Sequence, residues 1–139
     1  MTSRRLASAP FLAFAATIGA CASSAGYPGW DEVSTHAIPE RDATAPARPI
    51  DCRTYNDRTL LPGYTSVSIL VPVVVGVDGL VSGSGAAQVY PREEYDSAAP
   101  RLGEATRIAE ACVFEPATLD GDPVAVRRFV RFSYSVPGS

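Results

Sequence analysis

The clearest hydrophobic pattern in the chain is the alternation over residues 67–75, in which every odd position holds Val or Ile. β-Branched residues with a period of two predict a strand that buries one face. Asp78 and Gly79 follow it and favour a two-residue hairpin turn, so residues 80–89 are expected to return as a second strand. The Ser-Gly-Ser-Gly sequence inside this second strand gives it few side chains to pack.

The period changes to that of a helix over residues 91–112. The apolar residues of one helical face are Leu102, Ala105, Ile108, Ala109 and Cys112. Asp96 lies near the expected start, where a carboxylate suits the positive end of the helix dipole. We therefore expect one helix that packs its apolar face on the sheet.

A closing strand is predicted over residues 124–136, after a turn rich in Asp, Gly and Pro. Its expected buried positions are even, with Arg128 as the exception: Val126, Val130, Phe132 and Tyr134. Its expected solvent-facing positions include Arg127, Arg131, Ser133 and Ser135. The order strand, strand, helix, strand predicts an α+β fold with a small three-stranded, mainly antiparallel sheet and one helix on one face. The predicted core contains Val71, Val73, Ile108, Phe114, Val130 and Phe132.

Pro72 interrupts the first strand and cannot donate a main-chain hydrogen bond. With a two-residue turn at Asp78 and Gly79, its missing N–H would point away from the second strand and toward the closing strand. The expected strand order is second, first, closing. The closing strand would then form one edge of the sheet.

The N-terminus has the features of a secretory signal. Arg4 and Arg5 precede an apolar run over residues 6–20, which is too short to span a bilayer comfortably. The run ends in Ile18-Gly19-Ala20-Cys21, which resembles the lipobox of bacterial lipoproteins. We predict that residues 1–20 are a signal peptide and that Cys21 carries lipid. The alternatives are an ordinary signal peptide cleaved nearby and a single membrane anchor.

Residues 21–50 mix Ala, Ser, Gly, Pro and charged residues without a period, and we interpret them as the lipidated cysteine followed by a flexible tether. Trp30 and His36 are expected to be exposed in this tether. The folded domain is then expected to span residues 51–139.

Cys52 and Cys112 remain after the lipidated cysteine. A compartment outside the inner membrane is oxidising, so this pair predicts a disulfide. Two cysteines cannot fill a tetrahedral zinc site, and with His36 as the single histidine no nucleophile–histidine pair is available. We expect no metal, no cofactor and no enzymatic activity.

All 12 basic residues are arginines, and removal of Arg4 and Arg5 with the signal leaves 10 of them against 15 acidic residues. This acidic balance argues against nucleic acid as a partner, because phosphates require a basic surface.

The chain resembles the C-terminal domain of TonB-type energy transducers over about residues 60–136. The resemblance is carried by the valine-rich strand that ends in "VDGLV", by a helix with Leu102 and Ala105, and by a Phe-x-Pro-Ala corner with a Gly-x-Pro-Val turn. The matching residues of corner and turn are Phe114, Pro116, Ala117, Gly121, Pro123 and Val124. Gly103 stands where the family usually has Asp, and a lipid anchor replaces the transmembrane helix and proline-rich spacer. The resemblance therefore implies an accessory relative.

The resemblance implies strand addition, in which an extended segment of an envelope protein or outer-membrane receptor pairs with the closing strand. The expected binding residues are Arg127, Phe129, Arg131, Ser133 and Ser135. In the alternative interpretation, the arginines protect an exposed edge from aggregation. The expected function is a periplasm-facing peptide-binding module associated with TonB-dependent transport. The alternative function is a structural envelope lipoprotein. Ala22 lacks the aspartate associated with inner-membrane retention, which favours the outer membrane.

Overall fold

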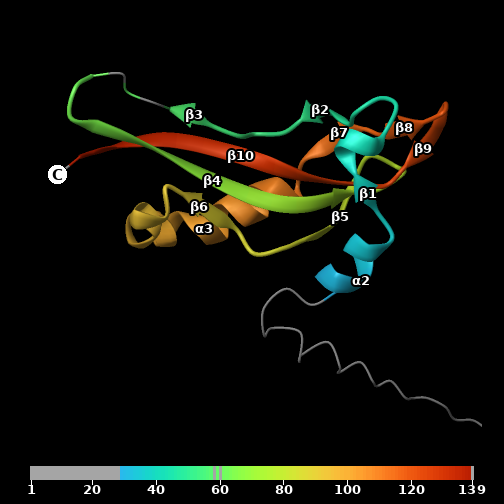
Figure 1. The fold of residues 1–139 in the computed structure, drawn as a ribbon, viewed down its shortest axis with the longest axis horizontal. Helices are drawn as coiled ribbons and strands as arrows, with labels where there is room; N and C mark the ends of the chain where they lie inside the picture. Colours follow the sequence, from blue (N-terminus) through green and yellow to red (C-terminus); the bar gives the residue numbers. More distant parts are fainter. Residues whose placement is uncertain (1–28, 58, 60, 139) are drawn as a thin grey trace, which may run out of the picture.

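Two long antiparallel strands form the centre of the molecule. The computed structural model describes residues 29–57, 59 and 61–138. Strand β4 (Tyr64–Val75) pairs with β10 (Val126–Pro137) along its whole length (Figure 1). On the other side of β4 lie β5 (Val81–Ser84) and β6 (Gln88–Tyr90). The expected order of second, first and closing strand is therefore present, although the second strand is broken at residues 85–87.

The sheet is larger than the predicted three strands. Two short strands, β1 (Ile38–Pro39) and β3 (Asn56–Asp57), run parallel to β10 on its outer edge. Two further pairs lie outside this sheet. They join β2 (Arg48–Asp51) to β7 (Val113–Glu115), and β8 (Ala117–Leu119) to β9 (Asp122–Val124). The fold is α+β, mostly strands with one main helix.

The main helix, α3 (Tyr95–Glu110), follows the short 3₁₀ turn η3 (Arg92–Glu94) and covers one face of the sheet. Its fully buried residues are Ala98, Ala105 and Ala109, whose small side chains let the helix lie close to the strands. Five of the six predicted core residues are buried in one cluster, and Ile108 packs against it while half-buried. The ring of Phe114 is 2% exposed.

Residues 29–50 are not a free tether as expected. They contain α2 (Trp30–Thr35), β1 and the 3₁₀ turn η2 (Glu40–Asp42), which contact the main sheet, and most of β2, which pairs with β7. Of the two residues predicted to be exposed here, His36 is exposed, whereas Trp30 lies over Gly85 and Pro72 and is half-buried. Residues 1–28, which include the predicted signal peptide and Cys21, lie outside the described residues. Within the described ranges, no helix is long and apolar enough to cross a membrane.

The turn after β4 differs from the predicted two-residue hairpin. The Gly76 N–H donates to the Leu80 carbonyl (2.8 Å), which makes the turn longer. Gly79 has φ +84°, and a side chain there would overlap the carbonyl oxygen of Phe114. The main-chain groups of Pro72 consequently point toward β5 and β6, because the Pro72 carbonyl accepts a hydrogen bond from the Gly85 N–H (2.8 Å). The interruption that was expected at Pro72 in the pairing of β4 with β10 is therefore absent.

Candidate partner-binding edge

The outer edge of β10 is the side that faces away from β4. The Ser133 N–H donates to the Tyr55 carbonyl (2.9 Å), and the Ala125 carbonyl accepts from the Ile38 N–H (3.1 Å). Because main-chain groups alternate along a strand, the odd residues of β10 all present their N–H and C=O groups to this edge. Phe129 and Arg131 are odd residues between Ala125 and Ser133, so their main-chain groups face the same edge.

Both ends of this edge are already paired within the chain. Strand β1 stands in register with Val126 and Arg127, and β3 with Ser133 and Tyr134. Among the described residues, no strand pairs with the outer side of residues 128–132, which we call the gap. The main-chain groups of Phe129 and Arg131 point into it. From the described part of the chain, the Phe129 carbonyl receives a long contact from Arg128 Nε (3.5 Å).

The predicted binding row is therefore wrong at its ends. The main chains of Arg127 and Ser133 lie opposite Pro39 and Asn56. The Ser135 hydroxyl accepts from the Thr59 N–H (2.6 Å). Ser133 was expected to face water and is 3% exposed. Two of the five predicted residues, Phe129 and Arg131, lie at the gap.

Arg127 and Arg128 contact the N-terminal elements of the fold. Arg127 Nη1 donates to the Ser34 carbonyl (2.9 Å) and to the Ala37 carbonyl, so its guanidinium holds the end of α2. Arg128 forms an ion pair with Glu40 (3.3 Å) and donates to the Ala47 carbonyl (2.9 Å). These contacts explain how an arginine occupies an even, inward position on β10, because its charge is paired at the edge of the core.

Arg131 lies flat against the sheet and is exposed. Its Nε donates to Ser133 Oγ (3.3 Å) and its Nη2 to Ser68 Oγ (3.0 Å), so two serine hydroxyls fix the position of its guanidinium. A hollow of about 320 Å³ separates Arg131 from residues 54–56. A second hollow of about 450 Å³ lies at the other end of the gap, between Phe129, Trp30 and Arg41.

Phe129 is 47% exposed, although it is a large apolar residue in the middle of a central strand. It stands opposite Pro72 of β4, and both side chains line a hollow that also contacts Trp30. Phe129 was predicted as a binding residue, whereas Trp30 was not. The aromatic character of Trp30 was visible, but nothing in the local pattern indicated where it docks.

Cys52 and Cys112 form the disulfide that the cysteine count predicts. Their Cα atoms are 4.4 Å apart and the residues are separated by 60 positions. The bond joins the segment that leads into β3 to Cys112, the second residue after α3. It therefore anchors the segment that covers one end of the β10 edge.

Comparison with family models, with curated proteins and with solved structures finds no match. The resemblance to the TonB C-terminal domain consequently rests on the sequence motifs of strand, helix, corner and turn alone. In the part of the chain that the structure describes, no group of three or more metal-binding side chains comes together.

Proposed function

We propose that this domain binds an extended segment of another cell-envelope protein by strand addition at the gap in the outer edge of β10. The observation that carries the proposal is the pair of outward-facing residues between β1 and β3, Phe129 and Arg131, with which no strand of the described residues pairs on this side. Main-chain hydrogen bonds would supply affinity, and the hollows on either side of the gap would select side chains.

The geometry of the edge defines the expected segment. Arg127 and Ser133 are six residues apart, which at roughly 3.3 Å per residue leaves a distance of about 20 Å. Strands β1 and β3 are both parallel to β10. A segment of about four extended residues, parallel to β10, would complete the line that these two strands begin.

Association with TonB-dependent transport, and a lipid anchor facing the periplasm, are part of the proposal and rest on the sequence resemblances. We propose a binding function rather than an enzymatic one. A second candidate is a structural envelope lipoprotein without a transport role. It is favoured by the caps on both ends of β10, because natural proteins cover exposed edges to prevent aggregation.

Replacement of Phe129 by proline is expected to abolish strand addition, because proline lacks the N–H that the segment would use. That N–H points away from β4, so no pairing with β4 is lost. Phe129→Ala is the matched control, since it removes the ring and keeps the N–H. Envelope extract would be passed over immobilised full-length protein, and the captured proteins would be identified by mass spectrometry. Proteins retained by Phe129→Ala should be lost from Phe129→Pro, and equal retention by both variants would refute strand addition.

Replacement of Cys21 by serine is expected to move the protein from the membrane fraction to the soluble fraction, because serine cannot receive the thioether-linked lipid. Wild-type protein should carry the lipid on an N-terminal Cys21, which intact-mass spectrometry detects. A wild-type protein cleaved elsewhere, with Cys21 unmodified, would end the lipoprotein interpretation.

A further inference from the structure

We propose that the sheet surface opposite α3 docks an acidic peptide segment with apolar side chains, through contacts that do not require main-chain pairing at the gap. We call this surface the open face. It is formed by the side chains of β4, β6 and β10 that point away from α3, namely Leu70, Pro72, Gln88, Tyr90, Phe129 and Arg131. This inference is independent of strand addition, which uses the edge of β10 and its main-chain groups.

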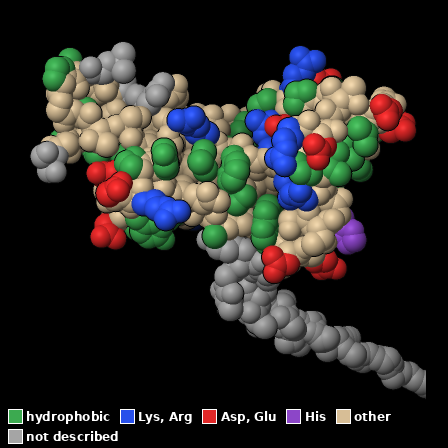
Figure 2. All heavy atoms as spheres, in the orientation of Figure 1, with side chains coloured by type: hydrophobic (Ala, Val, Ile, Leu, Met, Phe, Trp, Pro, Cys, Tyr) green, Lys and Arg blue, Asp and Glu red, His purple; other side chains and the backbone are tan. Residues whose placement is uncertain are grey.

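The open face is apolar and only partly covered. Helix α2 lies over one end, where Trp30 and Val33 sit on the glycines of the β5 region. Beyond it, Phe129 is 47% exposed and Tyr90 is 69% exposed, while Leu70 and Pro72 are half-buried. Figure 2 shows hydrophobic side chains in a row along these strands. Contiguous exposed apolar groups of this kind mark interaction surfaces.

Two adjoining hollows lie on the open face. One, of about 550 Å³, is lined by Leu70, Gln88, Tyr90, Arg92 and Tyr95, together with Val89. The other, of about 540 Å³, is lined by Trp30, Asp31, Pro72, Ala86, Gln88 and Phe129. Gln88 borders both hollows, so an extended segment with two apolar side chains would place one in each.

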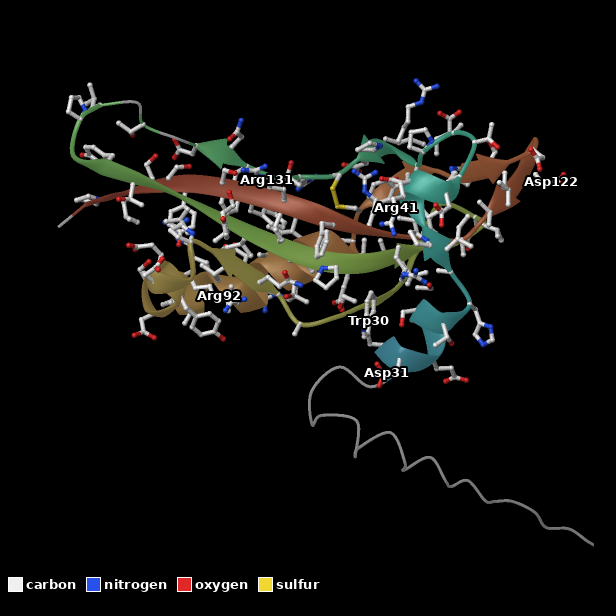
Figure 3. The ribbon with its side chains drawn as sticks, in the orientation of Figure 1. Trp30, Asp31, Arg41, Arg92, Asp122 and Arg131 are labelled. Atoms are coloured by element: carbon white, nitrogen blue, oxygen red, sulfur yellow. A yellow bond between two sulfur atoms is a disulfide. The ribbon has the colours of Figure 1, made fainter. Side chains whose placement is uncertain are left out.

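Arginines flank the row, although the whole chain has a formal net charge of −3. Arg131 stands opposite Leu70 on β10, and Arg92 lines the hollow on the other side of Leu70 (Figure 3). The ion pairs among the described residues are Arg48–Glu115 and Arg128–Glu40, and neither includes these two arginines. Arg92 is the charged residue that lines the hollow at Leu70, whereas Asp31 lines the hollow at Phe129, so the excess of positive charge lies at the Leu70 end of the open face.

The position of Arg131 favours a carboxylate as the ligand. Serine hydroxyls hold its Nε and Nη2 from below, and a guanidinium has five N–H donors, so donors remain for a partner. Arginine and carboxylate form charge-assisted hydrogen bonds, and a guanidinium held in place loses less entropy when it binds. Glutamate side chains next to the apolar ones would find Arg92 on one side of Leu70 and Arg131 on the other. An acidic peptide therefore complements the open face in charge and in shape.

A binding experiment with defined peptides tests this inference. Full-length protein in a neutral detergent would be titrated against fluorescein-labelled Ser-Glu-Phe-Glu-Leu-Glu-Ser, with fluorescence anisotropy as the readout. The matched peptide has glutamine in place of each glutamate. We expect the acidic peptide to bind at least about tenfold more tightly. This preference should shrink in 0.5 M salt, because exposed charges are screened.

Variants locate the contact. Arg92→Ser and Arg131→Ser should each weaken binding of the acidic peptide by about five- to tenfold and leave the glutamine peptide unchanged. Arg107→Ser is the control, since it removes the same charge from α3 on the opposite face of the sheet. It should have no effect on either peptide.

Several outcomes would overturn the inference: equal binding of the two peptides, absence of binding, or an equal loss in Arg107→Ser. Two further results would overturn it. Arg92 and Arg131 would be required for self-association in sedimentation experiments, or for binding to vesicles with anionic lipid, and in either case the acidic peptide would not compete. The two proposals can fail separately. If Phe129→Pro and Phe129→Ala retained the same envelope proteins while the preference for the glutamate peptide persisted, strand addition would be refuted and docking on the open face would stand.

Discussion

Replacement of Phe114 by alanine is expected to lower the free energy of unfolding by about 3–5 kcal/mol. The ring is 2% exposed and belongs to the core cluster, so the substitution removes buried apolar contacts and leaves a cavity. The guanidinium of Arg128 also lies 5.0 Å from the ring centroid. A loss of this size is a large part of the 5–15 kcal/mol that stabilises a typical domain. Urea denaturation followed by far-UV circular dichroism measures it.

Phe129→Ala provides the control for this prediction, because it removes the same ring from a half-exposed position on β10. We expect it to change the free energy of unfolding by less than about 1 kcal/mol. Equal losses in the two variants would contradict the assignment of Phe114 to the core. The corner that carries Phe114 would then not anchor β7 to the rest of the fold.

The long elements of the fold could be predicted because each buries one continuous face. In β4, Val67, Ile69 and Val71 alternate with less buried positions, so the period of two seen in the sequence is also the period of burial. Strand β10 buries Val130 and Phe132 in the same manner. Helix α3 is similar, since its buried alanines recur at helical spacing. Where packing and local pattern agree over a dozen residues, the period identifies the element.

The short elements could not be predicted, because two residues are too few to show a period. Strands β1 and β3 are each two residues long, and contacts distant in sequence place them. Arg127 reaches the carbonyls at the end of α2, and Tyr55 packs its ring 5.1 Å from that of Phe132. These contacts set the size of the gap. The sequence therefore indicated a binding edge on β10 and overestimated its length.

The turn after β4 shows how a small error in a turn changes which neighbouring strand a main-chain group faces. Asp78 and Gly79 favoured a two-residue turn, but the turn extends from Gly76 to Leu80. The Asp78 carboxylate accepts the Leu80 N–H (3.0 Å), which stabilises the longer form. As a result, the missing N–H of Pro72 faces β5 and β6, and the pairing of β10 with β4 is continuous.

Simultaneous replacement of Cys52 and Cys112 by alanine is expected to lower the free energy of unfolding by about 4 kcal/mol in the chain-entropy model. The two cysteines are 60 residues apart, so the unfolded chain gains much conformational freedom when the bond is removed. Reduction of the wild-type protein should lower its denaturation midpoint to nearly that of the double variant. An unchanged midpoint after reduction would show that the bond does not stabilise the domain.

Loss of the disulfide should also loosen one end of the binding edge. Cys52 leads into the segment with Tyr55, whose carbonyl accepts the Ser133 N–H (2.9 Å). Without the bond, the amide hydrogen of Ser133 should exchange faster, whereas that of Val130, which faces β4, should change only with global stability. Hydrogen exchange measured by NMR on both forms distinguishes the two effects. Equal acceleration at Ser133 and Val130 would mean that the disulfide stabilises the domain as a whole and does not set the length of the gap.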